Sequence, residues 1–295
     1  MRVPESVRAA LGVEVVECVA EPIAPGTGAA SGGLARLTCR TADGRTLSLV
    51  RKEFRPLSGG RHAPYANDPG HWAYWRREQL AYASGLLPAG PGLAAPRCFG
   101  ASGDAVYLAD IAGPPPEPDV AARHLAEWQT RTPVPDVSWL SGHQLAQRLE
   151  VTSLDWDAVP ADPRLRAVWA RRGELMAALD AVPMVLSHGD FHAGNLVARD
   201  GTTVVLDWAT FGVAPVGADL AYLALSTLTD PVPAYLDAGR MDAAGTDAAA
   251  VRLGYRVTLA LTGASRAHWM VSNGIPVPAG YVEFVLAEGQ PLGMG

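Results

Sequence analysis

The chain has 295 residues, of which 48% are hydrophobic and 18% are charged. This length and composition predict a folded protein with a sizeable core, built as one long domain or two lobes, and exclude intrinsic disorder. The net charge of −6 argues against a nucleic-acid or anionic-membrane partner and is compatible with a cationic substrate.

The three cysteines, Cys18, Cys39 and Cys98, are an odd number and form no Cys-x-x-Cys pair. Neither a disulfide framework nor a structural zinc site is therefore predicted. The N-terminus, with Pro4 and Glu5, lacks the apolar core of a signal peptide. No apolar run reaches the ~18 residues that a membrane span needs. We therefore expect a cytoplasmic protein with no membrane partner.

The N-terminal part of the chain has a β-rich pattern. Alternating residues and the turn signal Asp43-Gly44 predict strands over residues 13–20, 34–40 and 46–54. Between the first two strands lies a glycine-rich segment that contains Gly26 and Gly28. Glycines let backbone N–H groups approach phosphates, so this segment is suited to form a lid over a nucleotide. A plain glycine-rich turn is an equal alternative, because Ser31 replaces the third glycine of a dinucleotide fingerprint.

Lys52 is the only lysine among the 24 basic residues, the other 23 being arginines. Fitting a compact ammonium group among phosphates is one of the few tasks that arginine performs poorly. In the strand over residues 46–54, the period of two places Val50 and Lys52 on one face and Arg51 on the other. The segment Leu49-Val50-Arg51-Lys52 matches the spacing of the kinase motif Val-Ala-Ile-Lys, with Arg51 at a position that is usually apolar.

Residues 56–70 are rich in glycine, proline, asparagine and aspartate, and they predict a long loop that is suited to contact a substrate or partner. A helix is predicted over residues 72–87, because aromatic and aliphatic residues recur there at helical spacing. Glu78 lies in this helix. It is either the partner that orients Lys52 or a solvated surface charge.

A second hairpin is predicted over residues 97–108, before the Gly- and Pro-rich segment 110–116. Helices dominate after Pro118. They are predicted over residues 120–129, 142–150, 163–181, 218–228, 233–238, 246–272 and 279–288. A β-rich part followed by a helix-rich part predicts an α+β fold with an N-lobe over residues 1–109, a hinge over 110–116 and a C-lobe over 117–295.

One segment carries a pattern of acid and amide side chains, His188-Gly189-Asp190-Phe191-His192-Ala193-Gly194-Asn195. Asp207 follows at the end of an apolar run. An Asp, an Asn five positions later and a second Asp beyond a short hairpin suit phosphoryl transfer from a nucleotide. Asp190 can accept a hydroxyl proton, while Asn195 and Asp207 supply hard oxygen ligands for Mg²⁺.

This segment and Asp207-Trp208 resemble the catalytic loop of the aminoglycoside phosphotransferase and choline kinase family, small-molecule relatives of the protein kinases. The resemblance extends from Lys52 to Asp219. It implies a bilobal, protein-kinase-like α+β fold with one main helix in the N-lobe and a mostly helical C-lobe. It also implies Mg²⁺-dependent transfer of the γ-phosphoryl group of ATP, or of GTP, to a hydroxyl group of a small molecule.

The resemblance also implies roles for individual residues. Asp190 is the expected catalytic base, and Asn195 and Asp207 the Mg²⁺ ligands. His188 and Asp219 are expected to support the loop, Asp219 also as a helix N-cap. Nucleotide binding is assigned to the glycine segment, the strand that carries the lysine, the helix carboxylate and the hinge backbone, that is, to Gly26, Gly28, Val50, Lys52, Glu78, Asp110 and Ile111.

The acceptor is expected to be small. Only 11 residues separate Asp207 from Asp219, without an Ala-Pro-Glu motif, which is too short for an activation segment that docks a polypeptide. No obligate protein partner is indicated. Aminoglycosides, macrolides, amino sugars, nucleosides and choline or ethanolamine all remain open. The expected contacts are acidic or aromatic residues of the helical part, namely Trp139, Asp155, Trp156, Asp157, Asp230, Trp269 and Glu283.

Two other classes of function are compatible with parts of the pattern. A metallohydrolase would use His188, Asp190 and His192 as metal ligands, but the remaining histidines form no His-x-His or His-Glu-x-x-His pattern. A catalytically silent nucleotide-binding protein has no chemical need for a complete set of acid, amide and lysine side chains. We therefore favour the small-molecule kinase.

Overall fold

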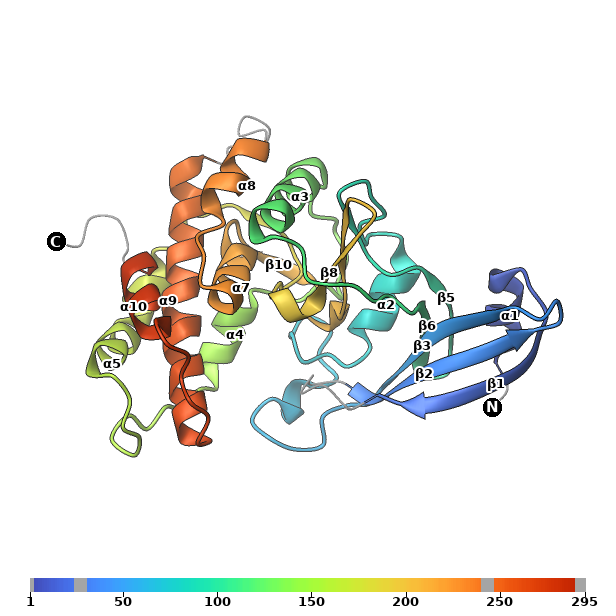
Figure 1. Cartoon of the computed structure of the whole chain (residues 1–295). Coiled ribbons are helices and arrows are strands. Elements are labelled where there is room, and N and C mark those ends of the chain that lie inside the picture. Colours follow the sequence, from blue (N-terminus) through green and yellow to red (C-terminus); the bar gives the residue numbers. More distant parts are fainter. Residues whose placement is uncertain (1–2, 24–30, 240–246, 290–295) are drawn as a thin grey trace.

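A computed structural model of the chain describes residues 3–23, 31–239 and 247–289. Figure 1 shows a β-sheet at one end of the molecule and a group of helices at the other, with α2 and β8 between them. The predicted α+β fold, with a β-rich N-terminal part and a helical C-terminal part, is confirmed. Gly26 and Gly28 lie outside the described residues, and so does the expected glycine lid.

The N-terminal sheet has five antiparallel strands in the order β1-β2-β3-β6-β5. The turn at Asp43-Gly44 joins β2 to β3, and Gly44 adopts the positive φ of 82° that favours glycine. All predicted strands of this region are present. The bounds are β1 Val15–Pro22, β2 Ser31–Thr41, β3 Thr46–Phe54, β5 Cys98–Ser102 and β6 Ala105–Ala109.

Each face of this sheet is covered by a helix. On one face, Val7 of α1 (Glu5–Leu11), a helix that the sequence analysis did not predict, shares a core with Leu37 and Leu49. On the other face, Phe54 and Leu108 pack with Trp75, just before α2. The alternation along β3 therefore directs Leu49 to the core with α1 and places Lys52 and Phe54 together on the opposite face.

Cys18 and Cys39 correct the prediction made from the cysteines. They lie opposite each other in the β1–β2 register and form a disulfide in this structure. An odd number of cysteines does not reveal which two will face each other across a hairpin, because that depends on strand register. Cys98 is a free cysteine.

The helix predicted over residues 72–87 is shorter than expected. Residues 72–76 form turns, and α2 spans Arg77–Ser84. Trp72 and Trp75 are buried by the preceding loop and the sheet. Their spacing in the sequence therefore reflects the burial of two turns and not a helix. Glu78 nevertheless lies in the first turn of α2. The loop over residues 56–70 is present and contains one short 3₁₀ turn, Ala63–Tyr65.

Two small sheets carry the segments around the expected catalytic loop. β7 (Met184–Ser187) pairs with β10 (Gly212–Pro215). β8 (Leu196–Arg199) and β9 (Thr202–Val205) form the hairpin before Asp207. β4 (Leu93–Ala94) comes from the N-terminal part of the chain and adds to this hairpin, parallel to β9.

The helical part surrounds these sheets. Its helices are α3 Pro118–Arg131, α4 Gln144–Glu150, α5 Pro163–Ala170, α6 Arg172–Ala177, α7 Ala218–Thr227, α8 Val232–Ala238, α9 Ala248–Ser272 and α10 Tyr281–Glu288. The single helix predicted over residues 163–181 is wrong. It breaks at Arg171 next to Gly173, a residue of low helix propensity.

The long helix α9 lies against α7 in the largest hydrophobic core of the molecule. A Cβ atom on Gly254 would lie 2.0 Å from the carbonyl oxygen of Val216, so only glycine permits this approach. None of the helices in the described ranges combines the length and the apolar character needed to cross a membrane.

Candidate active site

The loop that follows β7 is supported by hydrogen bonds to Asp219, a residue of α7 that is almost fully buried. Its carboxylate accepts hydrogen bonds from the backbone N–H groups of His188 and Gly189, both at 3.0 Å, and from the Ser187 hydroxyl at 2.8 Å. The amide of Gln129 donates a fourth bond at 3.3 Å. The expected support of the loop is present, but the expected N-cap is wrong, because Gly217 occupies the N-cap position.

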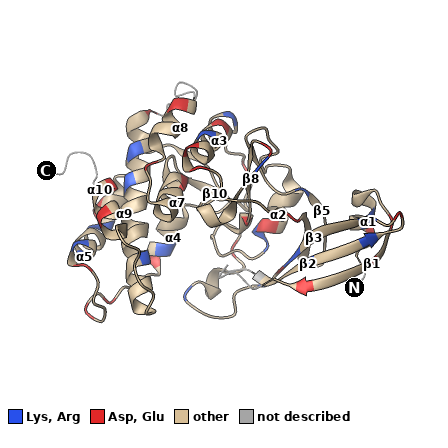
Figure 2. Ribbon diagram, viewed as in Figure 1, with Lys and Arg blue, Asp and Glu red and all other residues tan. Residues whose placement is uncertain are grey.

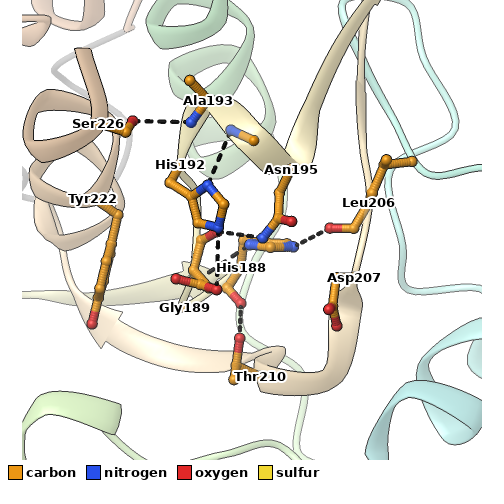
Figure 3. Close-up of polar contacts among 12 residues, drawn as sticks. His188, Gly189, His192, Ala193, Asn195, Leu206, Asp207, Thr210, Tyr222 and Ser226 are labelled. Atoms are coloured by element: carbon orange, nitrogen blue, oxygen red, sulfur yellow. Dashed lines mark hydrogen bonds and ion pairs between the residues drawn. The ribbon is translucent and has the colours of Figure 1, made fainter. Parts of the chain in front are cut away.

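His188 fixes the loop from within. Its Nε2 atom lies 2.9 Å from the carbonyl oxygen of Leu206, and its Nδ1 atom accepts from the backbone N–H of Asp190 at 3.3 Å. The ring is buried against the edge of Trp208, with centroids 4.8 Å apart. Both ring nitrogens are therefore engaged in positioning the chain between Asp190 and Asp207 (Figure 3).

Asp190 faces the open side of this loop, with its side chain 34% exposed. Its two carboxylate oxygens lie 3.5 Å from Nε2 of His192 and 3.6 Å from the guanidinium of Arg266. Burial by itself raises the pKa of Asp190, but His192, Arg266 and His188 outweigh it and lower that pKa to about 2. The carboxylate is therefore ionised near neutral pH and available as a proton acceptor.

Asn195 and Asp207 lie on the other side of the loop. The Asn195 side-chain N–H donates to the backbone carbonyl of Asp190 at 3.0 Å, which leaves its amide oxygen free of that contact. Asp207 adopts a left-handed conformation with φ of 61°, and its Oδ1 atom accepts from Lys52 at 2.8 Å. Across the described ranges, no hydrogen bond reaches Oδ2 of Asp207.

Lys52 joins the sheet to this site. Its ammonium lies 2.6 Å from Glu78 and 2.8 Å from Asp207. Burial opposes the charged form, but the two carboxylates outweigh burial and raise the pKa of Lys52. Glu78 is 1% exposed, so a solvated surface charge is ruled out for it, and burial raises its pKa. The implied pair between strand and helix is therefore present.

A cavity of about 300 Å³ extends from this charged group to Asp110 and Ile111. Val50 lines it with Leu34, Leu108 and Ile111, which together form an apolar slot of the kind that receives a flat base. The Asp110 side chain lines it as well, but its carboxylate binds Arg36 at 2.7 Å and Ser48 at 2.6 Å. These bonds to Arg36 and Ser48 tie Asp110 to the sheet.

The arrangement gives no support to the metallohydrolase alternative. His188 points to Leu206, and Nδ1 of His192 accepts from the backbone N–H of Gly194 at 3.0 Å. Throughout the described parts of the chain, no group of three or more His, Cys, Asp or Glu side chains converges as a metal site. An Asn–Asp pair is a different donor set, suited to a cation that phosphate oxygens also bind.

The acidic residues that were expected to bind the acceptor are occupied elsewhere. Glu283 pairs with Arg164 at 2.7 Å, and Asp157 pairs with Arg166 at 2.5 Å. Asp155 and Asp230 accept hydrogen bonds from backbone N–H groups of their own turns, those of residues 157 and 232. Trp139 packs on Phe211 and Trp156 on His268, while Trp269 is 54% exposed.

Two arginines at the site were missed by the sequence analysis. Arg77 is fully buried beside Glu78 and donates to the backbone carbonyls of Pro69, His71, Trp72 and Trp139. Arg266 contacts Asp190 from α9. Neither belongs to a motif, and in a chain with 23 arginines their identity alone gives no signal.

Comparisons with known proteins agree with this geometry. The sequence model of the family described as "Phosphotransferase enzyme family" (APH) matches residues 108–254, a range that contains Asp190, Asn195 and Asp207. No curated protein matches the sequence.

Three similar solved structures share the fold. A candidate fructosamine-3-kinase from Thermobifida fusca YX-ER1 is 20% identical, with a TM-score of 0.52 over 96% of this chain and 95% of that chain. Choline kinase LicA from Streptococcus pneumoniae is 12% identical, with a TM-score of 0.54 over 96% and 95%. Amicoumacin kinase hAmiN, solved with AMP-PNP, Ca²⁺ and Ami, is 14% identical, with a TM-score of 0.51 over 92% and 86%.

Proposed function

The chain belongs to the phosphotransferase enzyme family, and we propose that it transfers the γ-phosphoryl group of ATP to a hydroxyl group of a small molecule. Residues 1–109 and 117–295 act as two lobes and residues 110–116 as the hinge. The nucleotide occupies the cavity beneath Val50, with its base near Asp110 and Ile111 and its phosphates at Lys52. Use of ATP favours a cytoplasmic location.

One observation carries this proposal. Lys52, held between Glu78 and Asp207, lies in the same cavity as Asn195, and Asn195 hydrogen-bonds to the backbone of Asp190. A cation for phosphates, two oxygen donors for a metal and an ionised proton acceptor are therefore connected in space. Phosphoryl transfer needs these groups, because its catalysis rests on positioning and on neutralising the charge of the phosphates.

Asp190 accepts the proton of the acceptor hydroxyl while the hydroxyl oxygen forms a bond to the γ-phosphorus. The bond between that phosphorus and the oxygen bridging to the β-phosphate breaks, and ADP leaves with the electron pair. The products are ADP and a phosphate monoester. Lys52 balances negative charge on the phosphates, and Glu78 keeps the ammonium in place.

The donors on Asn195 and Asp207 fit a divalent cation, which we propose to be Mg²⁺. The amide oxygen of Asn195 and Oδ2 of Asp207 are hard oxygen ligands, and neither accepts a hydrogen bond within the described residues. When bound, such an ion supplies positive charge to the phosphate oxygens. Two protein ligands suffice, because Mg²⁺ commonly completes its shell with phosphate oxygens and water.

The test is ADP release from ATP in the presence of Mg²⁺ and a panel of hydroxyl compounds. Because choline kinase and amicoumacin kinase share the fold, the panel includes choline, ethanolamine and hydroxylated antibiotics, together with amino sugars and nucleosides. Asp190→Asn should abolish the stimulated release. Asp180→Asn, which changes an exposed aspartate away from the loop, should not.

Two results together would reject the proposal. The first is the absence of stimulation by any acceptor. The second is the absence of Mg²⁺-dependent ATP binding that Asp207→Asn removes. In that case zinc-dependent hydrolysis should be tested next.

A further inference from the structure

A second cavity, of about 450 Å³, adjoins the catalytic loop on the side of α7 and α9. Figure 3 shows Tyr222 and Ser226 on one side of this loop and Asp207 on the other. Two residues that line the cavity contact the loop: the Ser226 hydroxyl accepts from the backbone N–H of Ala193 at 3.0 Å, and Arg266 lies 3.6 Å from Asp190. Asp190 does not line the cavity, but Arg266 lines it and contacts Asp190, so a molecule bound in this cavity is one side chain away from Asp190.

Arg266 is the only charged residue among the nine that line this cavity, and no carboxylate is among them. Its guanidinium donates no hydrogen bond of 3.5 Å or less to any residue in the described ranges, whereas Arg36 and Arg164 each reach a carboxylate at 2.7 Å. Arg266 is 32% exposed and lies over the ring of Tyr222 at 5.4 Å. The guanidinium N–H groups of Arg266 therefore lie beside Asp190 and can donate hydrogen bonds to another anion.

Trp269 lies three residues after Arg266 on α9, so both side chains occupy one face of the helix. Both line the cavity, and Trp269 is 54% exposed, among the most exposed large hydrophobic residues of the described chain. The lining also includes Leu225, Met270 and Tyr281. An exposed indole on an apolar wall is suited to stack against a flat ring.

We infer that the acceptor of this enzyme carries an anionic group and a flat, mostly apolar ring near its hydroxyl, and that it is not a polyamine such as an aminoglycoside. Arg266 binds the anion and Trp269 stacks on the ring. A polycation would meet a guanidinium here and no carboxylate except the catalytic Asp190, which already pairs with Arg266. This inference rests on the proposed function, because it identifies the cavity as the acceptor site of that reaction.

The test uses three probes that share a benzene ring and a primary hydroxyl and carry an anionic, a neutral or a cationic group at the para position. They are 4-(hydroxymethyl)benzoate, 4-methylbenzyl alcohol and 4-(hydroxymethyl)benzylamine. Their dissociation constants are measured by saturation-transfer NMR on the full chain. We expect the carboxylate to bind about tenfold tighter than the ammonium, the size of one charge-assisted hydrogen bond.

Variants of Arg266 and Trp269 test which side chain causes the preference for the carboxylate probe. Arg266→Gln should remove the preference for the carboxylate, and Arg266→Lys should keep most of it. Arg252→Gln, about 21 Å away along the same helix, should leave it unchanged. Trp269→Ala should weaken all three probes alike. ADP binding by each variant verifies that the protein is folded.

Equal binding of the three probes, preference for the ammonium, or no detectable binding of any probe would each overturn the inference. A preference that survives in Arg266→Gln would do the same. Failure of the proposed function would be recognised separately, by the absence of Mg²⁺-dependent ADP binding. That binding does not depend on this cavity.

Discussion

The Asp219 carboxylate accepts a hydrogen bond from the backbone N–H of Gly189 at 3.0 Å, across 30 residues of sequence. With the bonds from Ser187 and His188, this contact ties the start of α7 to the loop that presents Asp190. Gly189 has a φ of 80°, and a Cβ atom there would lie 2.8 Å from the carbonyl oxygen of Thr210. The sharp turn before Asp190 thus depends on a glycine and on a buried acid.

Asp219→Asn is expected to lower the free energy of unfolding by about 3 kcal/mol, because an amide NH₂ replaces an oxygen that faces buried N–H donors. Urea denaturation measures this change. The matched control is Asp230→Asn, since Asp230 also accepts from a backbone N–H at a helix start but is only partly buried. We expect it to lose about 1 kcal/mol or less. Similar losses in both variants would contradict the bracing role.

Lys52→Arg is expected to lower kcat/KM for ATP at least about 100-fold, because a guanidinium is larger and cannot fit between Glu78 and Asp207 as a compact point charge. Steady-state kinetics with varied ATP measure the change. Arg51→Lys is the control, since Arg51 lies on the other face of β3 and pairs with Glu53. Activity of Lys52→Arg close to that of the unmodified protein would exclude a specific role for the ammonium.

His192→Ala is expected to move the acid limb of the kcat/KM profile to higher pH. Burial raises the pKa of Asp190, but the contacts with His192, Arg266 and His188 lower it to about 2, and His192 is the largest of these lowering contacts. Loss of the contact with His192 therefore lets the pKa of Asp190 rise. His124→Ala, which removes a contact with Thr203, is the control and should leave the limb in place.

The same depressed pKa has a consequence for stability. An aspartate whose folded pKa lies below its unfolded value of about 3.9 stabilises the fold above that pH and loses this contribution as pH falls towards 2. In His192→Ala the contribution of Asp190 should be smaller. The difference in free energy of unfolding between the unmodified protein and His192→Ala should therefore be smaller at pH 3 than at pH 6. The opposite trend would show that His192 does not act through Asp190.

Arg77→Lys is expected to lower the free energy of unfolding by about 3 kcal/mol, because a single ammonium cannot satisfy four carbonyls, and the buried ones left unpaired are costly. One of the four belongs to Trp139 in the helical part, so the change should also weaken ATP binding through α2 and Glu78. Thermal unfolding and ATP titration measure the two effects. Arg76→Lys, at the half-exposed neighbour that pairs with Asp104, should change neither.

Much of the site follows from the sequence because its groups have fixed spacing. Asp190, Asn195 and Asp207 lie within 18 residues on a loop and a hairpin, and local geometry brings them together. Lys52 could be predicted because it is a lone lysine on an alternating strand. Its contact with Glu78 depends on packing of a helix on a sheet, and the sequence supported it only through the family resemblance.

The features that were missed depend on contacts between distant segments. The disulfide of Cys18 and Cys39 follows from strand register, and the late start of α2 follows from tertiary burial of Trp72 and Trp75. Arg266 reaches Asp190 because α9 packs against α7 and, at Gly254, closely approaches Val216 just before α7. The acidic acceptor residues were predicted from charge alone. Figure 2 shows acidic and basic residues intermixed along the helices, and two of the predicted acidic residues, Glu283 and Asp157, pair with arginines.

The pairing of β4 with β9 affects how the two ends of the molecule can move. β4 comes between α2 and β5, so the chain enters the sheet of the helical end at Leu93–Ala94, returns to the five-stranded sheet, and leaves it again at residues 110–116. The two ends of the molecule are therefore linked by the β4–β9 pairing as well as by residues 110–116. We expect this second link to restrict the change in distance between Lys52 and Asp207 more than a single connection would.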